Sequence, residues 1–270
     1  MYISAMFRTK RRKLKRLDFI VAGAQKSGTT ALHYFLSKHP DVVLPDKQEM
    51  HFFDDDEIFS RPADYELLHR HFSPVARSTT PKKSGLAKSF GVSGESTPSY
   101  IYWKPAMERI WDYNPKIKLL VLLRNPVDRA FAHWNMQRFK DREPLDFLEA
   151  VKQEKSRITP PLSVQARRYS YVDRGFYSDQ LERVFSLFPR EQVMVIRFEE
   201  FQKQKQQTLD SIFRFLGVEP LRRIRDKDRN VVPYPREMTA EERKYLYAIF
   251  GWDIAKLEEL LGWDCSDWKL

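Results

Sequence analysis

The sequence predicts an α/β fold of three layers, in which a central and mainly parallel β-sheet of about five strands lies between helices. Short runs that are apolar on both faces, such as residues 19–22 and 118–123, are typical of strands buried in a parallel sheet. Segments with helical spacing follow these runs, and helices are the usual connections between parallel strands. The first run also ends in a glycine-bearing turn that leads directly into a helix, an arrangement that favours phosphate binding.

Length and composition fit one domain with a sizeable core. The chain has 270 residues, of which 42% are hydrophobic and 14% aromatic, and a domain of this size can form around a single core. We expect a basic arm over residues 1–17 and one domain over residues 18–270. The basic cluster at residues 10–16 is interpreted as a solvated arm, with contact to nucleic acid or lipid as the alternative.

The charge balance and the cysteine count restrict partners and compartment. A net charge of +10 favours anionic partners, such as a phosphorylated cofactor, an acidic glycan, nucleic acid or a membrane surface. Cys265 is the only cysteine, which excludes an internal disulfide. Because the sequence also has no signal-peptide pattern and no apolar run of roughly 20 residues, we expect a cytoplasmic protein.

Residues 23–28 form the turn around which the chain is organised. Gly23 and Gly28 have the spacing of a Walker A loop, but Thr29 stands where a nucleotide triphosphatase carries its lysine. The lysine is instead Lys26, inside the turn. Backbone N–H groups and a helix start predict a P-loop-like phosphate cradle, completed by the hydroxyls of Ser27, Thr29 and Thr30. The alternative is a turn that only joins strand to helix, with Lys26 in solvent.

A second candidate segment follows an extended stretch at residues 42–45. Glu49 and His51 are adjacent to Phe52 and Phe53, whose rings could pack against the sheet and hold the two polar groups at the rim of a site. The alternative is a surface loop, since acidic residues continue over residues 54–57.

A third candidate lies at the end of the clearest strand, residues 118–123. Arg124 follows it directly, and α/β folds bind ligands at the carboxyl ends of their strands. Its guanidinium can bind a terminal phosphate with two hydrogen bonds. Pro126 opens the next helix. On that helix we expect Arg129 to form a surface ion pair with Asp128 or another carboxylate.

The remaining elements follow from periodicity and from breaker residues. We expect further strands at residues 90–94 and 193–198, and helices at residues 29–36, 62–72, 103–114, 144–155, 174–188, 239–250 and 253–261, with one more that ends at Leu216. Trp252 and Trp263 are expected in the core, and His69 and His71 at the surface. No His or Cys cluster has the spacing of a metal site.

These segments resemble a known family. Residues 23–32, GAQKSGTTAL, are similar to the 5′-phosphosulfate loop of sulfotransferases that use 3′-phosphoadenosine-5′-phosphosulfate (PAPS). The strand that ends at Arg124 resembles the 3′-phosphate motif of that family. The segment with Glu49 and His51 resembles the one that supplies the catalytic base in glycan sulfotransferases. The nearest members are bacterial-type enzymes and glycan O-sulfotransferases of the heparan sulfate kind.

The resemblance implies roles for single residues. PAPS is the expected donor and 3′-phosphoadenosine-5′-phosphate (PAP) the product, with no metal. Glu49 is the expected general base, with His51 positioning or replacing it, and Lys26 stabilises the leaving phosphate. The expected donor-binding residues are Lys26, Ser27, Gly28, Thr29, Thr30, Arg124 and, in the charged loop over residues 222–235, Arg229.

Three positions depart from the family pattern. Gln48 and Ser96 stand where many members have lysine, and Ala132 stands where the family has a serine on the helix after the arginine. We therefore expect one hydroxyl contact and up to two cationic contacts to be missing or supplied by other groups.

The expected function is in-line transfer of a sulfuryl group from PAPS to an acceptor hydroxyl. The resemblance favours a carbohydrate and the basic surface an anionic glycan, while a lipid, a small metabolite or a carrier-bound acyl chain would fit the same site. One alternative is a P-loop nucleotide kinase or other phosphotransferase, against which the missing lysine after Gly28 argues. The other is a non-catalytic protein that binds a nucleotide or a polyanion.

Overall fold

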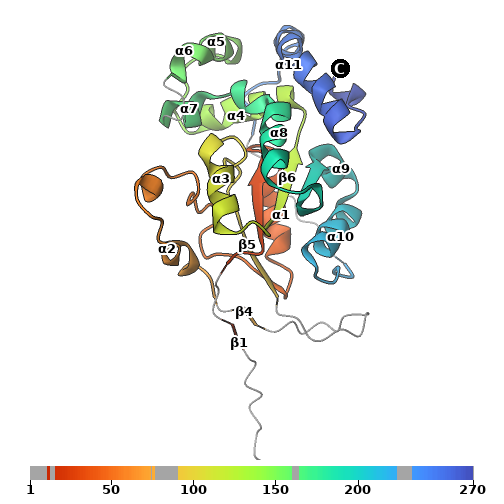
Figure 1. The fold of residues 1–270 in the computed structure, drawn as a ribbon. Helices are drawn as coiled ribbons and strands as arrows, with labels where there is room; N and C mark the ends of the chain where they lie inside the picture. The colour runs from red at the N-terminus through yellow and green to blue at the C-terminus, as the bar shows by residue number, and fades with distance from the viewer. Residues whose placement is uncertain are drawn as a thin grey trace, which may run out of the picture.

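The computed structural model describes residues 11–12, 16–73, 75–76, 91–159, 164–223 and 233–269. Its centre is a five-stranded sheet in the order β3-β5-β2-β6-β7, and every neighbouring pair is parallel. The strands are β2 (Phe19–Gly23), β3 (Val42–Val43), β5 (Val92–Ser96), β6 (Lys118–Leu123) and β7 (Val193–Arg197). The predicted class of fold is therefore confirmed (Figure 1).

Helices cover both faces of the sheet and its carboxyl end (Figure 1). They are α1 (Thr29–Leu36), α2 (Glu66–His69), α3 (Lys104–Tyr113), α4 (Pro126–Phe139), α5 (Phe147–Lys152), α6 (Glu154–Arg157), α7 (Val164–Tyr169), α8 (Tyr177–Leu187), α9 (Phe198–Lys203), α10 (Lys205–Leu216) and α11 (Ala240–Leu261).

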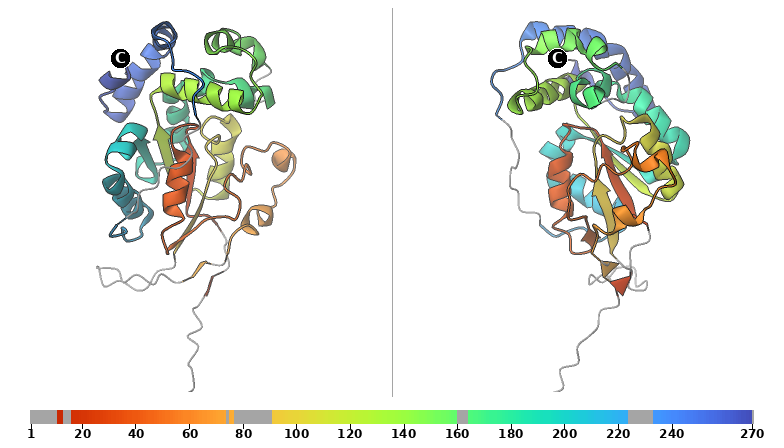
Figure 2. Two further views of the ribbon diagram at one scale, coloured as in Figure 1. Left: turned by 180° about the vertical axis from the view of Figure 1, so that it is seen from behind. Right: turned by 90° about the vertical axis from the view of Figure 1, so that its left-hand side faces the viewer.

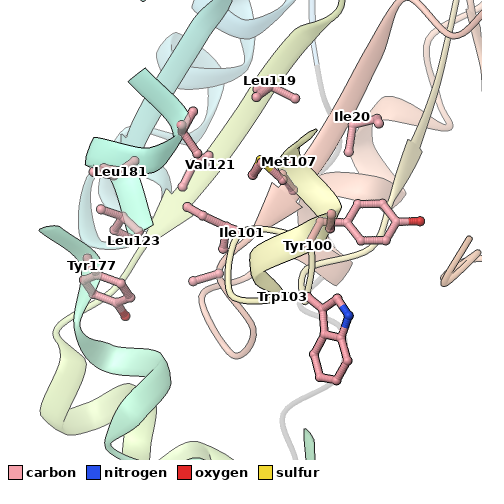
Figure 3. Close-up of a cluster of buried hydrophobic side chains, with 14 of the residues drawn as sticks. Ile20, Tyr100, Ile101, Trp103, Met107, Leu119, Val121, Leu123, Tyr177 and Leu181 are labelled. Carbon is pink, nitrogen blue, oxygen red and sulfur yellow. The ribbon is translucent and has the colours of Figure 1, made fainter. Parts of the chain in front are cut away.

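Two hydrophobic clusters, one on each face of the sheet, join the sheet to its two layers of helices. Alternate residues of a strand point to opposite faces, so Ile20 joins one cluster and Val21 the other. The cluster of Ile20 is packed by α3 and α8, and Figure 3 shows Met107 and Leu181 of these helices against the sheet. The opposite cluster is packed by α1, α9 and α10. Because β2 and β6 are covered on both faces, their continuous apolar runs are explained.

The C-terminal helix differs from the prediction of two helices. Residues 240–261 form the single helix α11, which begins with a complete capping box between Thr239 and Glu242. Gly251 and Trp252, which lie between the two predicted helices, continue α11 without a break. Trp252, predicted in the core, is 54% exposed and stacks on Phe176 with ring centroids 5.5 Å apart.

Two other helical segments are shorter than predicted. The helix expected over residues 62–72 is reduced to α2, and the one expected over residues 144–155 begins at Phe147 and is interrupted at Gln153. His69 was wrongly assigned to the surface, since it is 8% exposed and its ring lies 2.8 Å from the hydroxyl of Tyr113.

Arg129 was also predicted wrongly. It has no exposed surface and donates to the carbonyl of Tyr171, whereas Asp128 pairs with Arg243 at 2.9 Å. Helical spacing alone did not show that this face of α4 is covered by the segment around Tyr171.

Part of the N-terminal segment is described. Arg11–Arg12 forms the short strand β1, which pairs antiparallel with β4 (Val75–Ala76). Leu17 is fully buried, and its N–H donates to the hydroxyl of Tyr113 at 2.7 Å. None of the described helices has both the length and the apolar character needed to cross a membrane.

Candidate active site

The predicted phosphate cradle lies between β2 and α1. β2 ends at Gly23 and α1 begins at Thr29, so the turn lies at the carboxyl end of the sheet, below α4 (Figure 2). Gly28 caps α1 with a φ of 88°, and a Cβ there would lie 2.7 Å from the ring of Phe198. Only glycine can adopt this left-handed backbone and also leave room for the ring of Phe198.

Lys26 carries the charge of the cradle. Burial lowers its pKa, and the positive charges of Arg124 and Lys140 lower it further, while Glu49 acts in the opposite direction. Among the described residues, no carboxylate lies within ion-pair distance of its ammonium group. The side chain is therefore held in a cationic environment that an anion would neutralise.

The three hydroxyl residues of the cradle are not equivalent. Thr30 is half-buried and Thr29 is 5% exposed. The hydroxyl of Ser27 is fully buried, next to that of Tyr177. Tyr177 in turn donates to the carbonyl of Arg124 at 3.0 Å, which ties α8 to the end of β6.

Arg124 lies beside the cradle, as the sequence predicted. Its side chain is half-buried, with Nη1 3.5 Å from the carbonyl oxygen of Lys26 and the guanidinium 5.2 Å from the ring centre of Phe198. Ala132 is 2% exposed on the buried face of α4 and offers no hydroxyl. Arg229 lies outside the described residues, so its predicted role is not tested.

Glu49 and His51 are brought together, and a third residue joins them. His51 Nε2 lies 3.2 Å from Glu49 Oε2, and His51 Nδ1 lies 3.1 Å from Asp54 Oδ2. The chain thus forms a carboxylate–imidazole–carboxylate relay that runs from a half-exposed glutamate to a fully buried aspartate.

Asp54 is the residue that the sequence analysis missed. It opens the acidic run at residues 54–57 and was therefore included in a possible surface loop. Its side chain has 0% exposure and accepts from Arg167 Nη1 at 2.6 Å and from Ser99 Oγ at 2.5 Å. The available signal was its place directly after two phenylalanines, both of which are buried.

The relay loop is fixed by the segment after β5. Thr97 Oγ1 accepts from the N–H groups of Met50 and His51 at 3.0 and 3.3 Å and donates to Glu95 at 2.7 Å. The hydroxyl of Tyr100 accepts from the N–H of Phe52 at 3.0 Å. Complete burial raises the pKa of Glu95 to about 8, so this carboxyl group is largely protonated near neutral pH.

The charge state of the relay follows from these contacts. The hydrogen bonds to Asp54 and then to Glu49 raise the pKa of His51 to about 9. Burial opposes ionisation of Asp54, but the hydrogen bond and charge of His51, with Ser99 and Arg167, leave its pKa below the ordinary value. At neutral pH, His51 is therefore an imidazolium between two carboxylates.

The two other departures from the family pattern also lie near this site. Ser96 is 2% exposed and its hydroxyl lies 3.2 Å from Nδ1 of His33 on α1. Burial lowers the pKa of His33, while the charge of Glu49 raises it. Gln48 is exposed. The charge of Glu49 thus acts on both Lys26 and His33.

Fold and site together define a class of protein. A cationic glycine-bearing turn at the carboxyl end of a parallel sheet, with a carboxylate that acts electrostatically on its lysine, is suited to moving a charged group from a nucleotide-like donor. Within the described residues, no group of three or more His, Cys, Asp or Glu side chains could hold a metal ion.

Comparison with known proteins gives the family. A model of the sulfotransferase domain matches residues 16–230, and the chain belongs to this family. The resemblance noted in the sequence is confirmed, and the nucleotide kinase alternative is not favoured.

Two kinds of relative support this assignment. The chain is 30% identical over 202 residues to human heparan sulfate glucosamine 3-O-sulfotransferase 5, covering 74% of this chain and 53% of that protein. It is 28% identical over 207 residues to human bifunctional heparan sulfate N-deacetylase/N-sulfotransferase 2, covering 75% of this chain and 22% of the other. The chain thus spans about half the length of the first relative and less of the second.

A solved structure agrees with the fold over nearly the whole chain. A sulfotransferase from Alicyclobacillus acidocaldarius aligns with a TM-score of 0.73 at 32% identity, covering 95% of this chain and 100% of that one.

Proposed function

We propose that this protein transfers a sulfuryl group from PAPS to a hydroxyl group of a carbohydrate. The observation that carries the proposal is the relay of Glu49, His51 and Asp54 beside the cradle of Lys26. The carboxylate of Glu49 can take a proton from the acceptor, while the ammonium group of Lys26 stabilises the phosphate that leaves.

The residues of the cradle fit the donor. Lys26 has no carboxylate partner among the described residues, Gly28 places the start of α1 at the turn, and Arg124 lies beside them. PAPS supplies the activated sulfuryl group when bound. Lys26 and the N-terminus of α1 then favour negative charge at the 5′-phosphate, and Arg124 offers a guanidinium to the 3′-phosphate.

Glu49 is the better candidate for the general base. His51 is protonated at neutral pH, because its pKa is raised to about 9, and an imidazolium cannot accept another proton. Glu49 is 44% exposed, and His51 Nε2 binds its carboxylate from one side at 3.2 Å.

The acceptor class rests on the relatives. Two of them are named for heparan sulfate, and the net charge of +10 suits an acceptor that is already anionic. We therefore propose a glycan hydroxyl as the target.

The test is calorimetric titration of the whole chain with PAP, with adenosine 5′-phosphate, which lacks the 3′-phosphate, and with ATP. We expect PAP to bind tightest, and the preference for PAP to be lost in Arg124→Ala. Arg190→Ala is the matched control, since this exposed arginine stacks on Phe185 and not on a site residue. Equal binding of all three nucleotides to the unmodified chain would contradict the proposed donor.

A further inference from the structure

Four successive backbone N–H groups of the relay loop, residues 49–54, are bound by only two side-chain oxygens. The N–H groups of residues 50 and 51 donate to Thr97 Oγ1 at 3.0 and 3.3 Å. Those of residues 52 and 53 donate to the hydroxyl oxygen of Tyr100 at 3.0 and 3.4 Å. Residues 49–54 belong to no helix or strand, so these two side chains supply the hydrogen bonds that regular structure would otherwise provide.

The backbone of this loop is unusual at His51. Its φ is 52°, in the left-handed region that residues other than glycine seldom adopt. A residue persists in this region only where its surroundings hold it there. The N–H of His51 is bound by Thr97, and the next N–H along the chain is bound by Tyr100. The relay depends on this backbone, because from it the imidazole reaches both of its carboxylate partners.

Glu95 orients the hydroxyl of Thr97. A threonine hydroxyl has one proton to donate and two lone pairs that accept. The proton is donated to Glu95 Oε2 at 2.7 Å, which leaves both lone pairs for the two N–H groups of the relay loop. The oxygen of Thr97 therefore cannot turn away from the loop without losing hydrogen bonds on both sides.

These contacts are sealed from water, since Glu95, Thr97 and Tyr100 have no exposed surface. Burial raises the pKa of Glu95 to about 8, and the charged groups that act on it are Asp54 and His51 of the relay loop. A neutral carboxyl group still accepts a hydrogen bond from Thr97. Because no water can replace a lost partner, removal of either hydroxyl leaves backbone donors of the loop unsatisfied.

Tyr100 holds the loop at a second point along its length. Figure 3 shows its ring extending away from Ile101 and Met107, with the hydroxyl at the far end. The ring also packs edge to face on Phe53, with centroids 5.6 Å apart. Burial and then the charge of Glu95 raise the pKa of Tyr100, so its hydroxyl stays protonated near neutral pH.

We propose that Thr97 and Tyr100 are positioning residues of the reaction, with Glu95 orienting Thr97. They hold the left-handed backbone at His51 and thereby align its imidazole with the carboxylate of Glu49. The inference rests on the proposed function, because Glu49 is the base proposed there. It adds residues that act on the transfer step through the relay, without contact to donor or acceptor.

The test is made on the whole chain with Thr97→Val and Tyr100→Phe, each of which keeps the shape of the side chain and removes the hydroxyl. We expect kcat to fall roughly 10- to 100-fold, the scale of a small displacement of a catalytic group, with PAP affinity within about 2-fold of the original. The imidazole of His51 should titrate at lower pH in both variants, because its contacts with the two carboxylates weaken.

Conservative variants separate positioning from a general loss of stability. Thr97→Ser keeps the hydroxyl and should restore both kcat and the titration of His51. Glu95→Gln keeps an acceptor for Thr97 and should stay active at neutral pH, whereas Glu95→Leu removes this acceptor and should behave like Thr97→Val. Sulfation kinetics, PAP calorimetry and a nuclear magnetic resonance titration of His51 measure the three effects.

Ser93→Ala and Tyr113→Phe are the matched controls. Ser93 is a buried hydroxyl on the same strand as Glu95 and donates to Asp18 at 2.9 Å. The buried hydroxyl of Tyr113 accepts from a backbone N–H, that of Leu17, at 2.7 Å. Each control therefore removes a buried hydroxyl of the same kind away from the relay loop.

Lower kcat together with a lower pKa of His51, confined to the variants at Thr97, Tyr100 and Glu95→Leu, supports the proposal. Values of kcat and of the His51 pKa that match those of the controls overturn it, whatever the loss of stability. If Thr97→Val does not fold, Tyr100→Phe and the two variants of Glu95 decide the question. If the unmodified chain transfers no sulfuryl group, the proposed function fails, while the titration of His51 still decides whether these residues position the relay.

Discussion

Nδ1 of His51 lies 3.1 Å from Oδ2 of Asp54, a carboxylate with no exposed surface. The other ring nitrogen, Nε2, binds the carboxylate of Glu49. The imidazolium of His51 therefore connects the half-exposed Glu49 to the buried Asp54. Asp54 is in turn fixed by Arg167, 113 residues further along the chain. In the proposed mechanism the three residues have different roles: Glu49 takes a proton, His51 orients Glu49, and Asp54 keeps His51 charged.

Replacing Glu49 tests the base. Glu49→Gln keeps the size of the side chain but cannot accept a proton, so we expect the transfer rate to fall by about 100- to 10,000-fold. PAP affinity should remain within about 2-fold of the original, because the cradle is unchanged. Steady-state sulfation of a heparosan-type acceptor, with PAP calorimetry, measures both. Glu57→Gln is the control, since this exposed residue of the next turn has no place in the relay; an equal loss in both variants would contradict the assignment.

The protonation of His51 can be measured directly. We expect its imidazole to titrate at about pH 9 in a nuclear magnetic resonance titration. Because this pKa lies above the ordinary value of 6.5, the contacts of His51 stabilise the fold fully below about pH 6.5 and lose their contribution as the pH rises through about 9. Activity should decline over the same range. In Asp54→Asn the titration should move toward lower pH, and a midpoint near 6.5 in the unmodified chain would refute the charged relay.

Asp54 also contributes to the stability of the fold. Asp54→Asn removes a buried charge from Arg167 and His51, and we expect the free energy of unfolding to fall by about 2 to 4 kcal/mol, reduced by the partial exposure of Arg167. Asp56→Asn is the matched control, because Asp56 is 48% exposed and its pair with Arg109 should contribute less than about 1 kcal/mol. Urea unfolding of the two variants gives the comparison, and equal stabilities would show that burial of the Asp54 pair has no energetic weight.

Much of the fold could be predicted because its signals are local. The strand at Lys118–Leu123 was predicted with its observed bounds, since both faces of a central strand are apolar. The break predicted in α11 was wrong, because residues 251 and 252 continue the helix and a single glycine inside a helix costs only about 1 kcal/mol. Trp252 and Arg129 exchanged their expected environments, which shows that residue type alone does not determine burial on an amphipathic helix.

The site was predictable only in part. Lys26, Glu49 and Arg124 follow strand ends, and the carboxyl ends of parallel strands meet at one edge, so their convergence follows from topology. The role of Asp54 depends on Arg167 and on Ser99, 45 residues away, and no local pattern reports such contacts.

Alanine at Gly28 tests the role of the turn in donor binding, and alanine at Gly217 is the reference. Gly28 and Gly217 both have left-handed backbones, with φ values of 88° and 86°. Alanine costs about 1 to 2 kcal/mol at either position through backbone strain. At Gly217 no atom lies within 4 Å of the added Cβ, whereas at Gly28 the Cβ lies 2.7 Å from the ring of Phe198.

The ring of Phe198 lies 5.2 Å from the guanidinium of Arg124, so a shift of this ring also disturbs the contact with Arg124. We therefore expect Gly217→Ala to lose only the strain energy and to bind PAP normally. Gly28→Ala should lose more stability and should also weaken PAP binding at least about 10-fold. The displaced ring of Phe198 would disturb both proposed phosphate contacts, the turn around Lys26 and the guanidinium of Arg124. Urea unfolding and PAP calorimetry measure the two effects. Equal stability losses with unchanged PAP affinity would mean that neither the close ring nor the turn contributes to donor binding.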